Sequence, residues 1–379
     1  MFKFYVGTEI LVGTNVIDQL GENSKKYGKK VLVVTDKGIV SAGLLDIVAK
    51  SLDVAGVSYV VYDKTNENPT VQNVFDANKV CSDNKCDLII AVGGGSPIDC
   101  AKGVAVIAVN GGNPYDYNSV DGKPFDKALP TLVVSTTCGT GSEVSGGSVL
   151  TIPEEKIKFI IGSPIIFPVQ AYLDPRMIEN LPCGLVASTG IDAITHLIES
   201  YISKNSNVFS DGICIQGIKL VAKNLKAAVA GDLDARMQMM CAASMGAICF
   251  MQAGLGLVHA LAVTMGGIFG LHHGLLNAVL LPYVLEYNRI SQEEKYAEIA
   301  VAMGENIEGL TTREAAFIAI EAVKKLNIDI GIPTNLRALG IKEENIPEMA
   351  KKAVTHPDGV PNKRCYTLKD VEEIYRKAL

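Results

Sequence analysis

Residues 87–102, DLIIAVGGGSPIDCAK, contain the strand, turn and helix from which the first half of the chain is built. An unbroken apolar run ends at Val92, and three glycines follow at 93–95. Apolar runs without polar alternation are typical of strands buried on both faces of a parallel sheet. We expect Ser96 to be the N-cap of the next helix and Pro97 its first residue.

The same alternation of strand and helix continues on both sides of this stretch. Predicted strands lie at 31–35, 58–62, 87–93 and 131–136, and predicted helices at 44–52, 71–82 and 98–109. This order favours an α/β nucleotide-binding architecture with a parallel sheet. The first residues, MFKFYVGTEILVG, alternate as in a β-hairpin, and strand patterns stop after about Pro175. We therefore predict an α/β domain over residues 1–180 and an all-α domain over 181–379.

Composition excludes several classes of protein. The 379 residues are 48% hydrophobic and 20% charged, with a net charge of −6 and no basic stripe. This disfavours nucleic acid and anionic membranes as partners. The most apolar stretch, about 239–281, is interrupted by polar residues and glycines, which indicates buried helices. Nine cysteines without a CxxC pair, and no signal-peptide core, predict a cytoplasmic protein with reduced thiols.

Four of the five histidines lie between residues 191 and 274. Asp192 and His196 stand four residues apart on a predicted helix and so share one of its faces. His259 lies in an apolar helical run, and His273 follows three glycines. One carboxylate and three imidazoles could hold Fe²⁺ or Zn²⁺ with a position left open. A histidine in an apolar helix is more often a core residue, and spacing alone does not bring the two halves together.

The turn at Gly93, Gly94 and Gly95 can also carry chemistry. Glycines let backbone N–H groups approach a phosphate, and the N-terminus of a helix attracts anions. The pattern is not GxGxxG, however, and a tight turn without a ligand explains it equally well. Asp36 ends the first parallel strand, where a carboxylate can bind the adenosine ribose and favour NAD over NADP. Its alternative role is that of a turn or helix-cap residue.

Two further positions are candidates for cofactor contacts. The run TTCGTGSE at 136–143 offers hydroxyl groups and glycines after a predicted strand. It could bind a dinucleotide, or it could be a polar turn. Lys158 could reach a ribose or phosphate, or be a solvated lysine on an edge strand.

Five motifs in order along the chain provide a resemblance. GGGSPIDCAK, TTCGTGSEV, STGIDAITHLIESY, GLGLVHALA and LHHGLLNAVLLPYV are similar to the iron-containing (group III) alcohol dehydrogenases. The nearest branch looks like lactaldehyde reductase and 1,3-propanediol dehydrogenase. The resemblance implies a dehydroquinate-synthase-like fold: a dinucleotide-binding domain, a helical metal-binding domain, and an active site in the cleft between them. It also implies a homodimer or an assembly of dimers.

The resemblance implies a role for individual residues. The family's metal ligands fall on Asp192, His196, His259 and His273, and Phe250 matches an aromatic residue that lines the substrate pocket. Cofactor contacts fall on Asp36, Asn68, Gly94, Gly95, Ser96, Asp99, Thr136, Thr137, Thr140 and Lys158. The implied activity is hydride transfer between NADH and a small short-chain aldehyde, with one divalent metal, Fe²⁺ first and Zn²⁺ as the alternative.

Two departures from the family pattern concern the substrate. The family usually has a second histidine four residues after the third ligand, where this chain has Val263, so the proton must come through solvent or from His272. Gly147 replaces a larger polar residue. These changes keep an anionic aldehyde, such as sulfoacetaldehyde or succinic semialdehyde, as an alternative substrate. A dehydroquinate-synthase-like lyase and a non-enzymatic metal-binding role are more remote alternatives.

Overall fold

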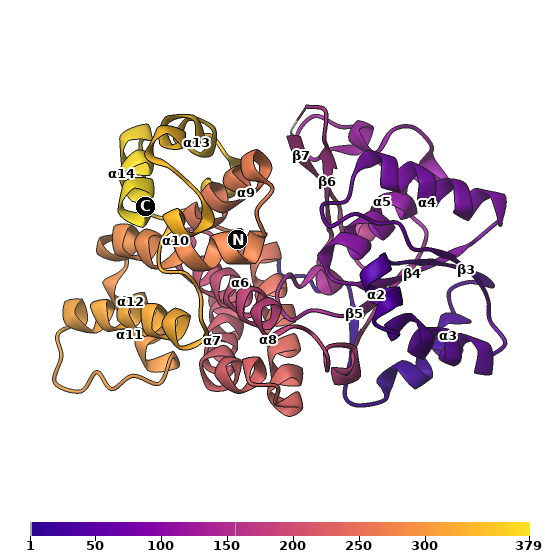
Figure 1. Ribbon diagram of the computed structural model, residues 1–379, viewed down its shortest axis with the longest axis horizontal. Helices are drawn as coiled ribbons and strands as arrows, with labels where there is room; N and C mark the ends of the chain where they lie inside the picture. The colour runs from indigo at the N-terminus through magenta and orange to yellow at the C-terminus, as the bar shows by residue number, and fades with distance from the viewer. Residues whose placement is uncertain (1, 156) are drawn as a thin grey trace. The chain divides into compact units, whose positions relative to one another are not determined.

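The structure is a computed structural model that describes residues 2–155 and 157–379. The described residues form two units. One unit spans Val6–Thr137 and Gly141–Asn180. The other consists of Leu181–Leu379, the segment Cys138–Thr140 and the N-terminal residues up to Tyr5. Figure 1 labels most of their helices and some of their strands.

The first unit is built on a six-stranded sheet in which every pairing is parallel. Its strands, in spatial order, are β1 (Glu9–Val12), β8 (Gln170–Leu173), β5 (Thr131–Ser135), β4 (Leu88–Gly93), β2 (Lys30–Val34) and β3 (Ser58–Tyr62). The four predicted strands are confirmed. Only β3 differs in its environment: it lies at the edge of the sheet, so most of its residues are partly or fully exposed.

Helices cover both faces of this sheet. They are α1 (Leu20–Ser24), α2 (Lys37–Ser41), α3 (Leu44–Val54), α4 (Val71–Asp83) and α5 (Gly95–Asn110). Alternate residues of β2 enter different cores: Leu32 packs with residues of α4 and α5, and Val33 packs with residues of α3. Because successive side chains of a strand point to opposite faces, both faces need an apolar residue. This accounts for the unbroken apolar runs in the sequence.

Two local expectations are wrong. The N-terminal segment forms no hairpin, because β1 pairs in parallel with β8, a strand about 160 residues later that local alternation cannot reveal. The helix after the glycines begins at Gly95 with Gly94 as N-cap, so Ser96 lies within its first turn. Gly93 has φ +155°, and a Cβ there would lie 2.5 Å from Pro97 Cγ. The glycine turn therefore allows the helix to start earlier than the proline suggests.

A small antiparallel pair, β6 (Gly147–Ile152) and β7 (Ile157–Gly162), completes the α/β unit. The sequence analysis did not predict this pair, although it considered an edge strand at Lys158. Gly147 lies opposite Gly162 in the register.

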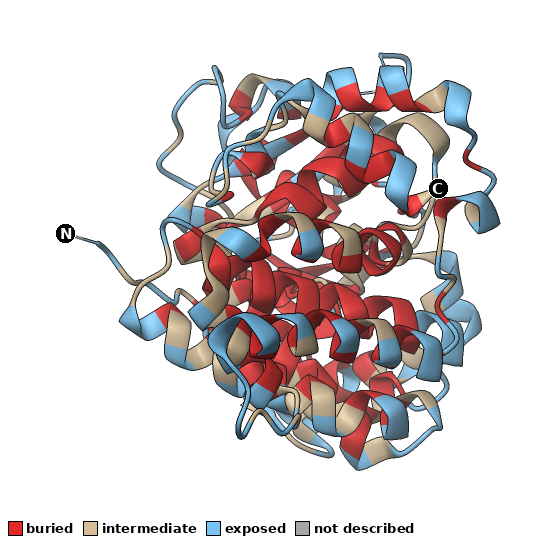
Figure 2. Cartoon of the chain, turned by 90° about the vertical axis from the view of Figure 1, so that its left-hand side faces the viewer, coloured by how far each residue is buried: buried red, intermediate tan, exposed pale blue. Residues whose placement is uncertain are grey.

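The second unit is helical, as predicted, and its described residues from 181 onward contain no strand. Its helices are α6 (Cys183–Ile202), α7 (Val208–Val229), α8 (Leu233–Ala253), α9 (Leu257–Phe269), α10 (His273–Asn288), α11 (Glu293–Ala302), α12 (Thr312–Asp329), α13 (Ile346–Ala353) and α14 (Leu368–Ala378). Every residue of helix α6 from Val186 to Ile202 is buried, the class of residue that Figure 2 colours red. A helix surrounded in this way holds its side chains in fixed positions.

No single helix among the described residues is both long and apolar enough to cross a membrane. Helices α8 and α9 meet this test of length and composition only as a pair, and that pair is bent by 105°.

Candidate metal centre and cofactor loops

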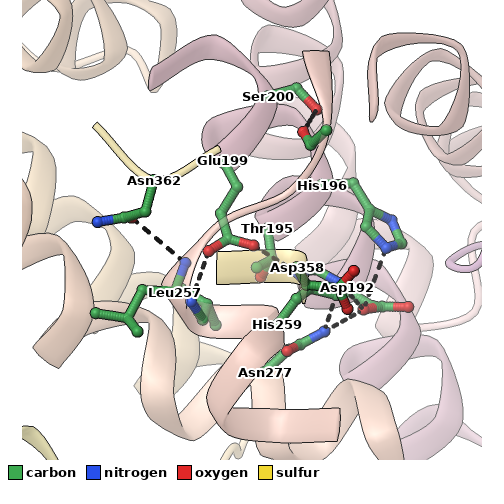
Figure 3. A network of polar contacts seen from close by, with 12 residues as sticks. Asp192, Thr195, His196, Glu199, Ser200, Leu257, His259, Asn277, Asp358 and Asn362 are labelled. Carbon is green, nitrogen blue, oxygen red and sulfur yellow. Dashed lines mark hydrogen bonds and ion pairs between the residues drawn. The ribbon is translucent and has the colours of Figure 1, made fainter. Parts of the chain in front are cut away.

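Four side chains from three helices converge within the helical unit. Asp192 and His196 come from α6, His259 from α9 and His273 from α10. The Oδ1 atom of Asp192 lies 3.8 Å from Nε2 of His196, 3.9 Å from that of His259 and 3.7 Å from that of His273. Figure 3 shows the first three. The two halves of the set that the sequence left apart therefore meet in space.

Two glycines allow the helices to pack closely around these ligands. A Cβ on Gly274 would lie 2.6 Å from the carbonyl oxygen of Ser188, one turn before Asp192 on α6. A Cβ on Gly246 of α8 would lie 3.1 Å from Cβ of His196. Backbones can approach this closely only where a side chain is absent. Asp192, His196 and His259 are consequently buried, whereas the side chain of His273 is 37% exposed.

The side-chain amide of Asn277 contacts three of these four side chains. Its Nδ2 donates to Oδ1 of Asp192 at 2.6 Å and lies 3.1 Å from Nε2 of both His259 and His273. One carboxylate oxygen and two imidazole nitrogens thus surround a single amide nitrogen, while Oδ1 of Asn277 is buried without a hydrogen-bond partner in the described residues. Metal bonds of about 2.1 Å place tetrahedral ligand atoms about 3.4 Å apart, close to the observed spacing. The donor set fits a divalent metal.

The charges in the site suit a cation. Burial raises the pKa of Asp192, but the surrounding histidines outweigh this effect and lower it to about 2. Burial lowers the pKa of His196 to about 4, against the attraction of Asp192. At neutral pH, Asp192 is therefore a carboxylate and His196 a neutral imidazole. Both are in the protonation state in which a side chain binds a metal.

The sequence analysis missed two residues of this site. Glu199 of α6 places Oε2 2.5 Å from Nδ1 of His259, and the pKa of His259 is raised because this carboxylate outweighs the effect of burial. Asn277 follows His273 by four residues on α10. Buried polar residues three or four positions from a ligand share its helix face, which was the available signal.

The residues expected near the substrate are in the same unit. The ring of Phe250 contacts that of His196, with centroids 4.9 Å apart. Val263 is half-buried on α9, and His272 is the N-cap residue of α10. The Nδ1 atom of His272 is buried and has no partner in the described residues.

The α/β unit brings several of the expected cofactor residues together. Gly94 and Thr137 follow the neighbouring strands β4 and β5, and a Cβ on Gly94 would lie 2.8 Å from Cγ2 of Thr137. Thr136 donates its N–H to the carbonyl of Gly93 at 3.0 Å. No side chain caps α5 at Gly94. A bare helix N-terminus beside glycines fits a phosphate.

Other expected residues bind to the protein itself. Asp36, after β2, accepts the N–H of Ile39 at 3.0 Å and so caps α2. Ser96 donates to the carbonyl of Glu67, and Nζ of Lys158 donates to Asn68 at 2.8 Å.

Asp99 and Thr140 are two further residues that were expected to contact the cofactor. Asp99 accepts the hydroxyl of Ser142 at 2.6 Å and the N–H of Val149 at 3.0 Å. Thr140 belongs to the segment that packs with the helical unit.

A buried cation holds the loop after Thr140, and it was not predicted from the sequence. Nζ of Lys102, on α5, donates to the carbonyls of Ser142 and Gly147 at 2.7 and 2.8 Å. It also contacts the hydroxyls of Ser142 and Ser145 at 3.1 Å. Burial lowers its pKa to about 8. This lysine fixes the backbone between β5 and β6 to α5.

Comparison with known proteins accounts for the whole chain. The family model described as iron-containing alcohol dehydrogenase matches residues 7–175, and the Fe-containing alcohol dehydrogenase family, C-terminal model matches residues 186–379. 1,3-Propanediol dehydrogenase of Citrobacter freundii is 43% identical over 384 residues, covering 100% of this chain and 99% of the relative. Lactaldehyde reductase of Escherichia coli (strain K12) is 38% identical over 369 residues, covering 97% and 96%.

The solved structures give the same result. A crystal structure of 1,3-propanediol oxidoreductase matches with a TM-score of 0.98 and 41% identity, covering 100% of both chains. The resemblance and the fold class expected from the five motifs are thus confirmed. The chain belongs to the iron-containing alcohol dehydrogenase family and is an alcohol oxidoreductase.

Proposed function

We propose that this chain reduces a neutral short-chain aldehyde with NADH, at one divalent metal held by Asp192, His196, His259 and His273. Membership of the family implies NAD(H) and a divalent metal. The observation that carries the proposal is the convergence of one carboxylate and three imidazoles around a single donor, Nδ2 of Asn277. Fe²⁺ is the proposed metal, and the same ligands accept Zn²⁺.

The chain's own residues prepare the site for this reaction. Reduction adds a hydride from NADH to the carbonyl carbon and a proton to the oxygen. A bound divalent cation supplies a Lewis acid for that oxygen. Asp192 is the one charged ligand among the four, so a bound divalent cation together with its ligands would keep one positive charge, which favours a developing alkoxide. Phe250, in contact with the ring of His196, gives the site an apolar wall.

The proton source follows from Val263. Since this side chain cannot transfer a proton, and Nδ1 of His272 is buried, we propose that solvent supplies the proton. His272→Gln should then leave the pH profile of kcat unchanged. A profile that shifts in this variant would assign the proton to His272.

The cofactor is proposed to bind at the ends of β2, β4 and β5. The pyrophosphate would lie at Gly94, Gly95 and Ser96 on the N-terminus of α5. Thr136, Thr137, Thr140, Asn68, Asp99 and Lys158 are the proposed surrounding contacts. Asp36, after β2, would bind the ribose hydroxyls and repel a 2′-phosphate. Its hydrogen bond to Ile39 uses one carboxylate oxygen, Oδ1.

An anionic aldehyde is the second candidate substrate, favoured by Val263 and Gly147. The test is NADH oxidation by the Fe²⁺-reconstituted enzyme with matched substrates: lactaldehyde and butanal against succinic semialdehyde and sulfoacetaldehyde. We expect higher kcat/KM for the neutral pair. A preference for the anionic pair would replace the leading substrate class and leave the reaction class unchanged. Stoichiometric loss of NADH separates both from a lyase, which recycles its cofactor.

We further propose that the enzyme is a cytoplasmic homodimer, or an assembly of dimers. No disulfide joins any of the nine cysteines, all of which lie among the described residues, and Cys183 and Cys365 are exposed, which suits a reducing compartment. Sedimentation equilibrium measures the assembly: a mass of one chain, 40.3 kDa, would exclude the dimer.

A further inference from the structure

Glu199 is a buried acid in direct contact with a proposed metal ligand. It lies on α6, three residues after His196, and is 2% exposed. Each of its oxygens accepts one hydrogen bond from the start of α9 (Figure 3). Oε1 accepts the N–H of Val258 at 2.6 Å, and Oε2 lies 2.5 Å from Nδ1 of His259.

The N-terminus of α9 is built to receive this carboxylate. Its N-cap residue is Gly256, which has no side chain to satisfy the first N–H groups. A Cβ at Gly256 would lie 2.7 Å from Oε1 of Glu199, so the close approach requires glycine. Asn362 accepts a second N–H of this turn, that of Leu257, at 3.3 Å. Two side chains from other segments therefore replace the usual cap, and one of them is an anion at the positive end of the helix.

The contact with His259 determines which ring nitrogen carries the hydrogen. A carboxylate only accepts hydrogen bonds, so Nδ1 of His259 must be the donor. In the neutral ring Nε2 then keeps its lone pair, and the donor Nδ2 of Asn277 lies 3.1 Å from it. The same Nε2 lies 3.9 Å from Oδ1 of Asp192. Both ends of the imidazole thus indicate a single tautomer.

We propose that Glu199 is a positioning residue that holds His259 in the Nδ1–H tautomer, with the lone pair of Nε2 facing the other ligands. The inference rests on the proposed metal ligands and adds to them a residue that is not itself a proposed ligand. Glu199 fixes the direction of a ligand and also caps the helix that carries it. A hydrogen-bonded partner of this kind strengthens metal binding by about 10–100-fold.

Glu199→Gln is the sharpest test because it preserves size and shape. The amide oxygen can still accept the N–H of Val258, but its NH₂ group faces Nδ1 of His259 and can only donate. The imidazole must then carry its hydrogen on Nε2, where it blocks the lone pair. We expect the affinity of the full-length protein for Zn²⁺, measured by chelator competition, to fall about 10–100-fold. In the metal-free protein labelled with ¹⁵N-histidine, at a pH high enough for the His259 ring to be neutral, this ring should change from the Nδ1–H to the Nε2–H form.

Three matched variants separate positioning from general damage. Glu199→Asp keeps an acceptor-only carboxylate and should retain the Nδ1–H form and part of the affinity. Asn362→Ala removes the other cap of α9 and should lower stability without changing tautomer or affinity. Glu298→Gln makes the same acid-to-amide change at the partner of the Tyr201 hydroxyl, away from His259, and should change neither.

The outcomes are distinct. Glu199→Gln with wild-type affinity and an Nδ1–H ring would overturn the inference while leaving the metal site in place. Equal loss of affinity in Asn362→Ala would also overturn it, because helix capping alone would then be responsible. If the wild-type protein and His259→Ala bound Zn²⁺ equally weakly, the proposed ligand set itself would be wrong.

Discussion

The candidate metal centre and the edge of the sheet proposed to bind the cofactor, called the cofactor edge here, hold their polar residues in different ways. In the metal centre, Asp192 and the imidazoles face one another and Asn277, within buried helices. At the cofactor edge, Asp36 caps α2 and Asn68 pairs with Lys158, so these side chains already have partners in the protein. The first set is unexplained without a ligand, whereas much of the second also supports local structure. Substitutions of the metal-free protein should therefore affect function more than stability in the first region, and function and stability together in the second.

The strongest test of this difference removes a ligand. We expect His259→Ala to lose bound metal and to lower kcat/KM by about a thousandfold or more, because the Lewis acid contributes several kcal/mol to the transition state. The fold should remain, since no backbone group depends on the imidazole. Metal analysis and circular dichroism of the purified variant measure both effects.

The control for this variant is another histidine. His356, between α13 and α14, accepts the N–H of Asp358 and belongs to no proposed ligand set. His356→Ala should keep its metal and most of its activity. Unchanged metal content in His259→Ala would sink the ligand assignment.

The next prediction concerns the buried cation of the α/β unit. The pKa of Lys102 is lowered from 10.5 to about 8, so between these pH values the unfolded chain binds a proton that the native protein does not. The free energy of unfolding should therefore rise with pH across this window, relative to Lys102→Met, by about 3 kcal/mol in total. Below pH 8 the difference between the two proteins should be constant. Urea unfolding at pH 7.5 to 10.5 measures this difference in the free energy of unfolding. Parallel curves of stability against pH for the two proteins would mean that the pKa of Lys102 is not lowered.

These regions also show how far the sequence alone leads. Asp192, His196, His259 and His273 could be singled out from the sequence as candidate ligands because metal-binding side chains are chemically distinctive, and the structure brings them together. The buried strands were predictable for a similar reason: their apolar runs report burial on both faces. Asn277 was not predictable, since an asparagine in an apolar helix has many uses and only the fold shows its partners.

Long-range pairing accounts for the other errors. The parallel pairing of β1 with β8 joins segments about 160 residues apart, and the N-terminal pattern contains no sign of that partner. The start of α5 was misplaced because Pro97 suits several positions in a first turn, whereas the glycines before it allow an earlier start. Lys102 was missed since a buried lysine needs acceptors, and those at 142–147 come together with it only through folding.

Metal binding should stabilise the helical unit by mass action. Free Zn²⁺ at 100 times its dissociation constant should raise the free energy of unfolding of the wild-type protein by about 2.7 kcal/mol. His259→Ala should gain much less, because its ligand set is incomplete. Equal stabilisation of both proteins would indicate that the metal binds elsewhere. The difference drawn between the candidate metal centre and the α/β unit would then be wrong.

The smallest expected effect separates the two roles of Asp36. Asp36→Ser keeps a side-chain oxygen that can cap α2 but removes the negative charge. If the carboxylate repels a 2′-phosphate, the ratio of kcat/KM for NADPH to that for NADH should rise about tenfold, equivalent to about 1.4 kcal/mol. Stability should change little, because the cap is preserved. Asp36→Gly should raise the same ratio and also cost a few tenths of a kcal/mol through the lost cap. An unchanged cofactor preference in both variants, with lower stability in the glycine variant alone, would mean that Asp36 is only a helix cap. The proposed reason for a preference for NADH over NADPH would then be wrong.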